Sequence, residues 1–529
     1  MGEVDRLEKR DAGLLDRKIF IYAMAAAMIW GMTHLYAFTR LMVSHDSLAE
    51  FYADARLESG YTGVQWKIAL GRFVVPIYQK LVRTTTSMPW MIGMLSVLFL
   101  GLTVYVVARM FRMRRGLTVF LTAGILIANP AVFTTAATFI HDLDSDMLAL
   151  LAGAAAAWCW REEKPWLLAL GSLCVCVCMG IYASYLSVTV VLVIFASILS
   201  LLEGERPGKV VLRGFVAIGM ILAGLLIYAL VARVMCALTG VQLASGGYNS
   251  IGNALEEQTR GNLLKNLLRS YHDVGHALLY ERFGHGSSIS VLAALTLGGG
   301  LILLFARMII GRVSLLSAVL ILVLLALLPV GMDIAMIANN GYVHDLMQYA
   351  FMLAYLLALL LAEHELDTPV RARRAVCMLL TAFIGLGCWQ QVVHANQIYL
   401  KKDLESRFTA SAMTRIMTQL EQREDYVRGE TPLLFAGDLG WQTKMRVEQV
   451  RYWDYTGMGS STPIQSWKLY EPYLEYMMGI EVIYVDGQTR WDMVTSEQVH
   501  AMPIYPEAGS IEMIDGVLVV KVGPVNETR

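Results

Sequence analysis

Charged side chains are scarce in this chain of 529 residues. They make up 16% of it, whereas soluble domains carry about 25%. Hydrophobic residues reach 56% before glycine is counted, and the mean hydropathy is +0.52. This composition excludes a disordered chain, a collagen and an ordinary soluble enzyme. The formal net charge is −1, so no overall field attracts nucleic acid and we expect no nucleic-acid partner.

The chain also lacks the signatures of a disulfide scaffold and of a nucleotide site. Its 7 cysteines are an odd number, and all lie in apolar runs, which does not fit a disulfide framework. Cys174, Cys176 and Cys178 resemble a metal cluster, but spacings of two residues spread them around a helix. The sequence contains no GxGxxG motif, no P-loop and no internal repeat.

Long hydrophobic runs dominate the first three quarters of the chain. A membrane-spanning helix needs about 20 mostly apolar residues. The sequence predicts eleven spans, of which the fourth, fifth, eighth and tenth are short, and residues 166–202 allow one long bent helix instead. The predicted spans are residues 19–38, 89–108, 117–133, 147–160, 166–180, 182–202, 210–238, 291–305, 313–332, 347–361 and 375–393.

Basic residues alternate across these spans. Lys and Arg gather in every second connection, while the short connections 134–146 and 333–344 contain neither. The positive-inside rule therefore places the N-terminus in the cytoplasm and residues 394–529 outside it. The 18 residues before the first span, with no small-residue cleavage site, argue against a removed signal peptide.

Two regions follow from this topology. Residues 1–393 form the membrane region, with outer loops at 39–88 and 239–290, and residues 68–82 in the first loop suit a helix lying in the membrane plane. Charged residues are denser in 394–529, for which we predict a soluble α/β domain outside the cytoplasm. Its expected helices are 396–426 and 464–478, and its expected strands are 433–435, 482–485 and 517–522.

Polar candidates gather at the outer edges of the spans rather than at the membrane midplane, where a transporter places its charges. Asp46 follows the first span and can act as general base toward a sugar hydroxyl; alternatively it caps a helix through residues 48–57. Arg233 lies near the outer end of its span. It is a functional candidate because intramembrane charge is costly, or it extends to the headgroups.

Two further outer loops carry candidate groups. Asp142 and Asp144 form a DxD triplet, which can hold a divalent metal against a diphosphate; alternatively the acids mark the start of the fourth span. His344 precedes the tenth span and can donate to a phosphate, although a turn followed by a helix cap explains the same residues. A metal cofactor is therefore left open, with Asp142 and Asp144 as its ligands if there is one.

The order of these motifs resembles that of a known family. An acid follows the first span, the pair Gly71-Arg72 opens the helix in the first loop, and Asn129-Pro130 breaks the third span. Further along come Tyr182 and Tyr185, the helix start Asn396-Gln397-Ile398-Tyr399 and the strand Pro432-Leu433-Leu434-Phe435-Ala436-Gly437. This pattern resembles the bacterial serotype-converting membrane glucosyltransferases (the Gtr type II group), within the GT-C class of glycosyltransferases.

The resemblance implies a GT-C-like polytopic helical protein of the bacterial cytoplasmic (inner) membrane. It implies transfer of a sugar, glucose in this group, from a polyprenyl-phosphate donor to a cell-envelope glycan on the outer face. The expected transfer inverts the configuration of the anomeric carbon. The expected result is a modification of the cell-surface glycan like that of an O-antigen. Together with the polar candidates above, the resemblance leads us to expect catalysis by Asp46 and Asp142, donor phosphate binding by Arg72, Arg233 and His344, and sugar binding by His45, His141, Tyr182 and Tyr185.

Two other classes of protein remain open at this level. One is a different lipid-linked glycan transferase or polymerase. The other is a non-enzymatic membrane receptor whose outer domain binds a partner. The small α/β tail does not suit a polymerase, and a receptor has no need of acids and a cation at the membrane interface.

Overall fold

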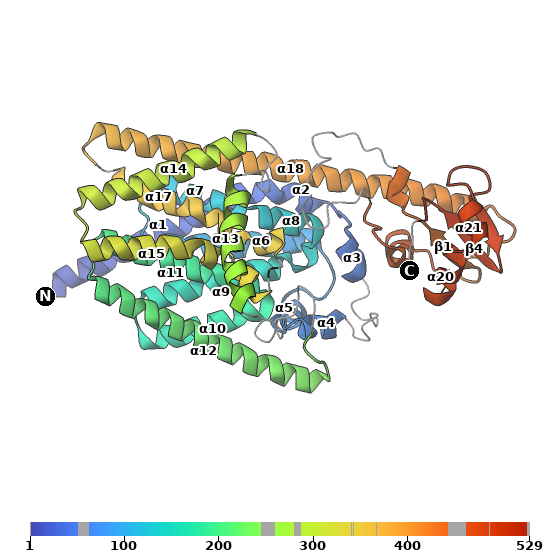
Figure 1. The fold of residues 1–529 in the computed structure, drawn as a ribbon, viewed down its shortest axis with the longest axis horizontal. Coiled ribbons are helices and arrows are strands. Elements are labelled where there is room, and N and C mark those ends of the chain that lie inside the picture. Colours follow the sequence, from blue (N-terminus) through green and yellow to red (C-terminus); the bar gives the residue numbers. More distant parts are fainter. Residues whose placement is uncertain are drawn as a thin grey trace. The chain divides into compact units, whose positions relative to one another are not determined.

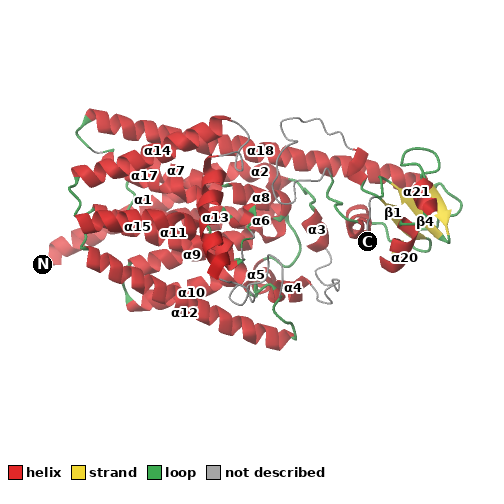
Figure 2. Ribbon diagram, viewed as in Figure 1, coloured by secondary structure: helices red, strands yellow, loops and turns green. Residues whose placement is uncertain are grey.

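The computed structural model describes residues 2–50, 63–244, 260–279, 287–339, 341, 343–366, 368–442, 462–485 and 487–525. By its internal contacts the chain divides into two units (Figure 1). The first consists of Met1–Thr39, Val64–Ala136 and Ile140–Asn396, and the second of Arg40–Gly63, Ala137–Phe139 and Gln397–Arg529. Among the described residues, all strands belong to the second unit (Figure 2).

The first unit is a bundle of helices. Its α-helices are α1 Gly2–Gly31, α2 Leu35–Thr39, α4 Gly63–Ala69, α5 Val74–Val82, α6 Pro89–Met110, α7 Gly116–Ile127, α8 Pro130–Thr138, α9 Leu143–Arg161, α10 Pro165–Ile181, α11 Leu186–Leu202, α12 Pro207–Thr239, α13 Arg260–Leu279, α14 Ser287–Ile310, α15 Leu315–Met332, α16 Ile334–Ala338, α17 Leu353–Glu365 and the first part of α18 Arg371–Glu421. Its 3-10 turns are η1 Met32–His34, η2 Ile140–Asp142, η3 Ala183–Tyr185, η4 Asp345–Met347 and η5 Tyr349–Met352.

Seven helices within the described residues are long and apolar enough to cross a membrane, or eight if the bent pair α7 and α8 is one span. The prediction of a polytopic helical protein is confirmed, but the count of eleven is higher than length and composition support. The other three predicted spans correspond to α9, α10 and α17. They fall short because α9 carries two acids in its first turn, α10 has 17 residues and α17 has 13.

Proline and glycine mark where several helices begin and end. Pro89, Pro165 and Pro207 occupy the first turns of α6, α10 and α12, where the missing N–H has no helical partner in any case. At the end of α12, Gly240 adopts φ 68°, a left-handed conformation that glycine reaches without strain. The predicted break at Asn129-Pro130 is present: α7 and α8 meet at 44°, and Asn129 Oδ1 accepts from the N–H of Ala131 at 3.0 Å.

The predicted in-plane helix over residues 68–82 is two helices. It is divided between α4 and α5 at Gly71, whose φ of 74° ends the first helix. Lys67, Tyr78 and Gln79 are buried in the protein rather than laid on its surface. One side of the segment is therefore packed into the first unit, while Ile77, Lys80 and Leu81 on α5 are exposed.

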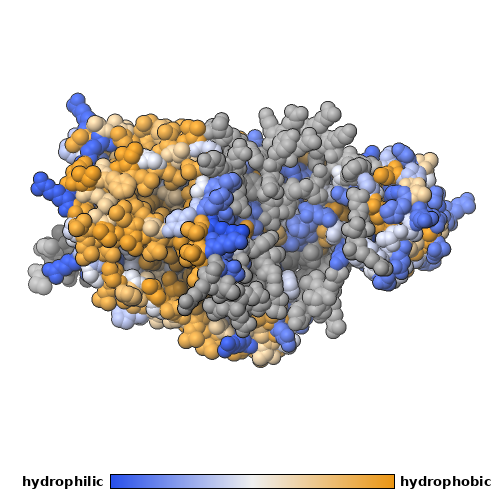
Figure 3. All heavy atoms as spheres, viewed as in Figure 1, coloured by the Kyte–Doolittle hydropathy of each residue, from blue (hydrophilic) through white to orange (hydrophobic). Residues whose placement is uncertain are grey.

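The exterior of the spanning helices is apolar. Large hydrophobic side chains are exposed along them, and Figure 3 shows this apolar surface over the region of α12, α14 and α15. Exposed examples on α12 are Leu222, Leu226 and Leu230, and on α14 and α15 they are Ile302, Ile309, Leu315 and Leu322. Such a surface is stable only in contact with lipid or another apolar body.

The second unit is a small α/β domain, as predicted. It contains α3 His45–Glu50, the end of α18, β1 Pro432–Ala436, η6 Leu439–Gln442, η8 Trp467–Leu469, α19 Tyr470–Pro472, the π-turn η9 Tyr473–Met477, β2 Ile483–Tyr484, α20 Gly487–Val494, α21 Glu497–Ala501, β3 Ile511–Ile514 and β4 Val517–Lys521. The strand order is β2-β1-β4-β3, with β1 parallel to β2 and β4, and β3 antiparallel to β4.

Alternation along β1 fills the core on both faces of the sheet. Leu433 and Phe435 pack in a cluster with residues of α18, whereas Leu434 and Ala436 pack in a second cluster with residues of α20 and α21. Successive side chains of a strand point to opposite faces, so a central strand with both faces covered is apolar throughout. Phe435 also stacks on Tyr470, with ring centroids 4.3 Å apart.

Three predictions for the tail need correction. The span at 375–393 and the helix at 396–426 are one continuous helix, α18, which ends at Glu421. The helix predicted at 464–478 is a series of short turns between Trp467 and Met477. Strand β3 was not predicted, although it forms a hairpin with β4 through Asp515-Gly516, whose φ angles of 48° and 80° suit a type I′ turn.

Candidate functional site

Lys67 and Asp142 form a buried ion pair in the first unit. Lys67 lies in the last turn of α4 and donates to Asp142 Oδ2 across 2.5 Å, with side chains 10% and 11% exposed. The other carboxylate oxygen, Asp142 Oδ1, is buried with no hydrogen-bond partner within the described part of the chain. A buried carboxylate oxygen with spare acceptor capacity is a group that a substrate hydroxyl can satisfy.

Asp142 is ionised at neutral pH. Burial by itself raises the pKa of this carboxyl, but the nearby Lys67 ammonium outweighs burial, and the pKa falls to about 2. The charges of His141 and Arg72 act in the same direction. Asp142 is thus a fixed anion within a basic environment. A carboxylate of such low pKa is a weak base, so its surroundings favour holding Lys67 over accepting a proton.

Asp144 is tied to Arg83 at the start of α9. Arg83 Nε and Nη2 approach Asp144 Oδ2 and Oδ1 at 2.7 and 3.1 Å, and neither side chain is exposed. Tyr78 OH donates to the same carboxylate at 2.9 Å. Two parallel N–H···O bonds between a guanidinium and a carboxylate fix the orientation of both groups. Asp144 therefore joins α9 to the end of α5.

His141 is also held by the segment around α5. Its Nε2 lies 3.2 Å from Gln79 Nε2, its Nδ1 lies 2.7 Å from Ser87 Oγ, and its carbonyl accepts from Arg83 Nη2. His141 is buried, with 3% of the residue's surface exposed. These contacts fix the η2 turn and with it the adjacent Asp142.

Arg72 and a series of aromatic rings lie beside the ion pair. The Arg72 guanidinium lies over the ring of Tyr182, 4.6 Å from its centroid. Tyr182 and Tyr185 are 6.0 Å apart edge to face, and Tyr185 packs on Tyr349 at 5.4 Å. Arg72 remains half-buried, while Tyr185 is almost fully buried. A guanidinium over the face of an aromatic ring is held there by a cation–π interaction.

The structure therefore brings Arg72, Asp142, His141, Tyr182 and Tyr185 into one part of the first unit. We call Lys67, Arg72, Asp142 and Tyr182 the Lys67–Asp142 cluster. The other two predicted phosphate ligands belong to other elements. Arg233 is exposed on the apolar helix α12, and His344 is half-buried directly before η4.

Asp46 and His45 belong to the second unit, in the first turn of α3. The cap of this helix is Ser44, whose Oγ accepts from the Ser47 N–H at 3.1 Å, so the alternative role of Asp46 as the cap is wrong. Leu48 anchors α3 in the core of the second unit. Asp46 is half-buried, and residues 51–57 of the helix expected there lie outside the described residues.

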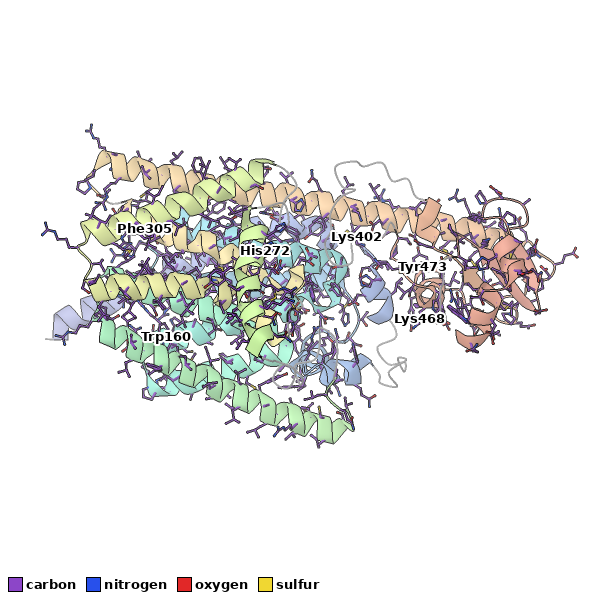
Figure 4. The ribbon with its side chains drawn as sticks, in the orientation of Figure 1. Trp160, His272, Phe305, Lys402, Lys468 and Tyr473 are labelled. Carbon is purple, nitrogen blue, oxygen red and sulfur yellow. The ribbon has the colours of Figure 1, made fainter. Side chains whose placement is uncertain are left out.

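His45 is neutral at working pH. Burial, assisted by the charge of Lys402, lowers the pKa of its imidazole to about 4. Lys402 (Figure 4) is fully buried and pairs with Glu405 Oε2 at 2.8 Å. The ring of His45 meets Phe139 edge to face at 5.7 Å. A neutral His45 can donate a hydrogen bond to a sugar hydroxyl or accept one from it, but it adds no positive charge for a phosphate.

The two acids considered as metal ligands do not fit a metal site. Asp144 is occupied on both oxygens by Arg83, and Asp142 is paired with Lys67, so cations of the protein already neutralise them. Across the described ranges no group of three or more His, Cys, Asp or Glu side chains could hold a metal ion. Divalent oxygen-ligand sites need several such ligands around one point.

The helices and this polar cluster define an integral membrane protein with ionisable groups buried where spans end, an arrangement that marks a functional site. A sequence model of the family described as Glucosyl transferase GtrII matches residues 49–362. The chain belongs to this family, which confirms the resemblance and makes it a membrane glucosyltransferase. No curated protein matches the chain.

Two functional partners were missed in the sequence. Lys67 and Arg83 were not predicted to contact the acids, which follow them by 75 and 61 residues. Their neighbours gave a usable signal, since Lys67 and Arg83 flank a segment whose apolar residues repeat with helical period. A cation that becomes buried needs an acid as partner, and Lys67 and Arg83 are both buried.

Proposed function

We propose that the chain transfers glucose, with inversion, from a polyprenyl-phosphate donor to a cell-envelope glycan on the outer face of the bacterial cytoplasmic membrane. Family membership establishes glucose transfer, and the remaining details are inferred. The observation that supports a lipid-phosphate donor best is the Lys67–Asp142 cluster. It offers cations beside membrane-spanning helices, as the phosphate of a lipid-linked sugar requires.

Arg72 is the proposed ligand of the donor phosphate. Its guanidinium lies over the ring of Tyr182, and the ion pair with Asp142 holds Lys67 close by without adding net charge. Arg233 and His344 remain secondary candidates, since Arg233 lies on the exposed surface of α12. A soluble nucleotide sugar would need a nucleotide pocket, for which the sequence carries no motif.

Asp46 is the proposed general base. In an inverting transfer the acceptor hydroxyl attacks the anomeric carbon, the bond to the donor phosphate breaks, and the base accepts the hydroxyl proton. Of the two candidate acids, Asp142 is the weaker base, because Lys67 lowers its pKa. Asp46 lies half-buried in the first turn of α3. His45, neutral beside it, suits a hydrogen bond to the acceptor.

The proposed reaction is tested by comparing surface glycans of cells with and without the gene. We expect one additional glucose per modified repeat only when the gene is present. An unchanged glycan composition in a strain that produces the folded protein would contradict transfer to the envelope and favour another lipid-linked acceptor.

Replacement of Arg72 tests the phosphate contact. We expect Arg72→Ala to raise the KM for the lipid donor by about 10- to 100-fold, because hydrogen bonds between charged groups contribute about 1.5–3 kcal/mol. The measurement is a donor titration with purified protein in detergent. Lys80→Ala, an exposed cation on the same segment, serves as control. An unchanged donor KM in Arg72→Ala would remove Arg72 from the phosphate site and leave the donor class standing.

The outer-face assignment predicts where the C-terminus lies. A phosphatase reporter that folds only outside the cytoplasm should be active when fused after Arg529 and inactive when fused after Gly204, between α11 and α12. The reverse pattern of activity would place the second unit in the cytoplasm and exclude transfer at the outer face.

A further inference from the structure

Helix α13 has three distinct faces. With 3.6 residues per turn, its side chains fall into one buried stripe and two exposed ones. The buried stripe contains Asn266, Ser270, Val274 and Ala277. The first exposed stripe is apolar and contains Leu264, Leu268, Tyr271 and Leu279. The second exposed stripe is basic and contains Lys265, Arg269, His272 and His276.

The buried stripe fixes α13 across one end of two spanning helices. It packs on α14, α15 and α16, and Tyr271 OH donates to the carbonyl of Ala326, in the second half of α15. Figure 1 shows α13 running crosswise to α14 and α15 near their ends. If those two helices cross a membrane, α13 lies parallel to its surface, at the level where hydrocarbon gives way to headgroups.

The two exposed stripes match the two sides of that boundary. Leucines suit the acyl chains and cations suit the headgroup layer, which is the pattern of a helix lying in the interface. Figure 3 shows polar side chains at the position of α13, at the edge of the apolar surface of α14 and α15. His272 lies on α13 in Figure 4 and stacks on His276, with centroids 5.7 Å apart.

An open groove of about 420 Å³ runs along the seam between the stripes, lined by Leu264, Lys265, Leu268, Arg269 and His272. Its two leucines and two permanent cations lie one helical turn apart within each pair. The nearest acid on the helix, Asp273, is half-buried beside His272, with 3.4 Å between Oδ1 and Nδ1. The groove therefore combines a positive edge with an apolar edge.

We propose that α13 is an interfacial helix whose groove binds the phosphate headgroup of an anionic phospholipid, with the acyl chains along Leu264 and Leu268. A bilayer phospholipid fits better than the glucose donor, because the groove is open on the surface of α13 and lies apart from the residues proposed to bind the donor. This binding is independent of the reaction proposed above.

Helix α13 is connected to the Lys67–Asp142 cluster through packed elements. Helix α13 packs on η5, which contains Tyr349, and Tyr349 packs on Tyr185 next to the ring under Arg72. A lipid bound on α13 would thus contact a helix that packs on η5, which contributes Tyr349 to the aromatic series. The bound headgroup holds α13, and through it η5, at a fixed depth in the bilayer.

Native mass spectrometry of the full-length protein in detergent tests the proposal. Titration with dioleoylphosphatidylglycerol should show selective retention over dioleoylphosphatidylcholine. The double variant Lys265→Gln/Arg269→Gln should weaken phosphatidylglycerol binding on the order of tenfold or more, since each basic residue near an anionic surface contributes roughly fivefold. Retention of phosphatidylcholine should not change.

Matched controls separate this site from general surface charge. Arg269→Gln alone should weaken binding, whereas Arg415→Gln, an exposed arginine on α18 in the second unit, should not. Equal retention of both phospholipids, or equal binding by wild type and Arg269→Gln, would overturn the proposal. Loss of a polyprenyl phosphate with phosphatidylglycerol retained would also overturn it, by showing that the groove takes the donor lipid.

Discussion

Replacement of Asp46 by Asn should abolish glucose transfer while leaving expression and membrane insertion unchanged. The amide is nearly isosteric with the carboxylate but cannot accept the proton of the acceptor hydroxyl, and loss of a general base lowers rates on the order of 10²–10⁴-fold. Because Ser44 caps α3 and Leu48 anchors it, the helix keeps its supports in the variant. The measurement is the initial rate of glucose transfer by equal amounts of purified protein.

Asp492→Asn provides the matched control. Asp492 is exposed on α20 in the same unit, and its carboxylate accepts a local hydrogen bond from Gln488 at 2.9 Å. We expect it to transfer glucose at the wild-type rate. Near-wild-type activity of Asp46→Asn would move the base to Asp142 or exclude general-base catalysis by either acid.

Removal of Arg83 should unfold the region around the Lys67–Asp142 cluster. Arg83→Ala leaves Asp144 as a fully buried carboxylate with its cation gone, and breaking a buried pair in this way costs about 3–5 kcal/mol. The same change frees the carbonyl of His141, which accepts from Arg83. We expect a marked fall in the thermal midpoint of the detergent-purified protein and a lower yield of folded material.

An exposed ion pair in the same unit gives the comparison. Arg109 and Asp16 are joined at 3.0 Å with side chains 38% and 36% exposed, so Arg109→Ala should cost about 0.2–1 kcal/mol. The double variant Arg83→Ala/Asp144→Ala should be less unstable than Arg83→Ala, because no charge is left unpaired. Equal thermal midpoints for Arg83→Ala and Arg109→Ala would contradict the claim that the buried carboxylate of Asp144 needs Arg83 for the stability of the fold.

Local signals in the sequence predicted local structure well. The apolar runs of β1 and β4 and the break at Asn129-Pro130 each depend on neighbouring residues alone, and each was found. The hairpin before β4 was missed although Asp515-Gly516 is a strong turn signal between two short apolar runs. Recognition of that turn would have added β3.

Changes of composition were a weaker guide. The sequence turns polar at Asn396, and a helix boundary was expected there, but α18 continues to Glu421. No proline or glycine interrupts residues 388–428, and polar residues of good helix propensity extend a helix as readily as apolar ones. The side chains change from apolar to polar along α18, but the backbone hydrogen bonding of the helix continues.

The candidate site was predictable in its acids and not in their partners. Asp142 stands out in the sequence because it is an acid beside an apolar run. Lys67 has no such local signal, and only folding places its Nζ 2.5 Å from Asp142 Oδ2. His141 and Tyr185 are both buried, His141 among hydrogen-bond partners and Tyr185 between aromatic rings, and their predicted contacts with sugars stay predictions. Long-range pairing decides between a positioning role and an exposed one, and it is absent from local sequence.

The identity of the donor tests the account most directly. Purified protein in detergent should be supplied with a glycan acceptor and either polyprenyl-phosphate glucose or a nucleotide-linked glucose, in separate reactions. We predict transfer of glucose from the polyprenyl-phosphate donor and none from the nucleotide sugar. Transfer from the nucleotide sugar with no lipid carrier present would contradict the proposed donor and the role of Arg72 as its phosphate ligand.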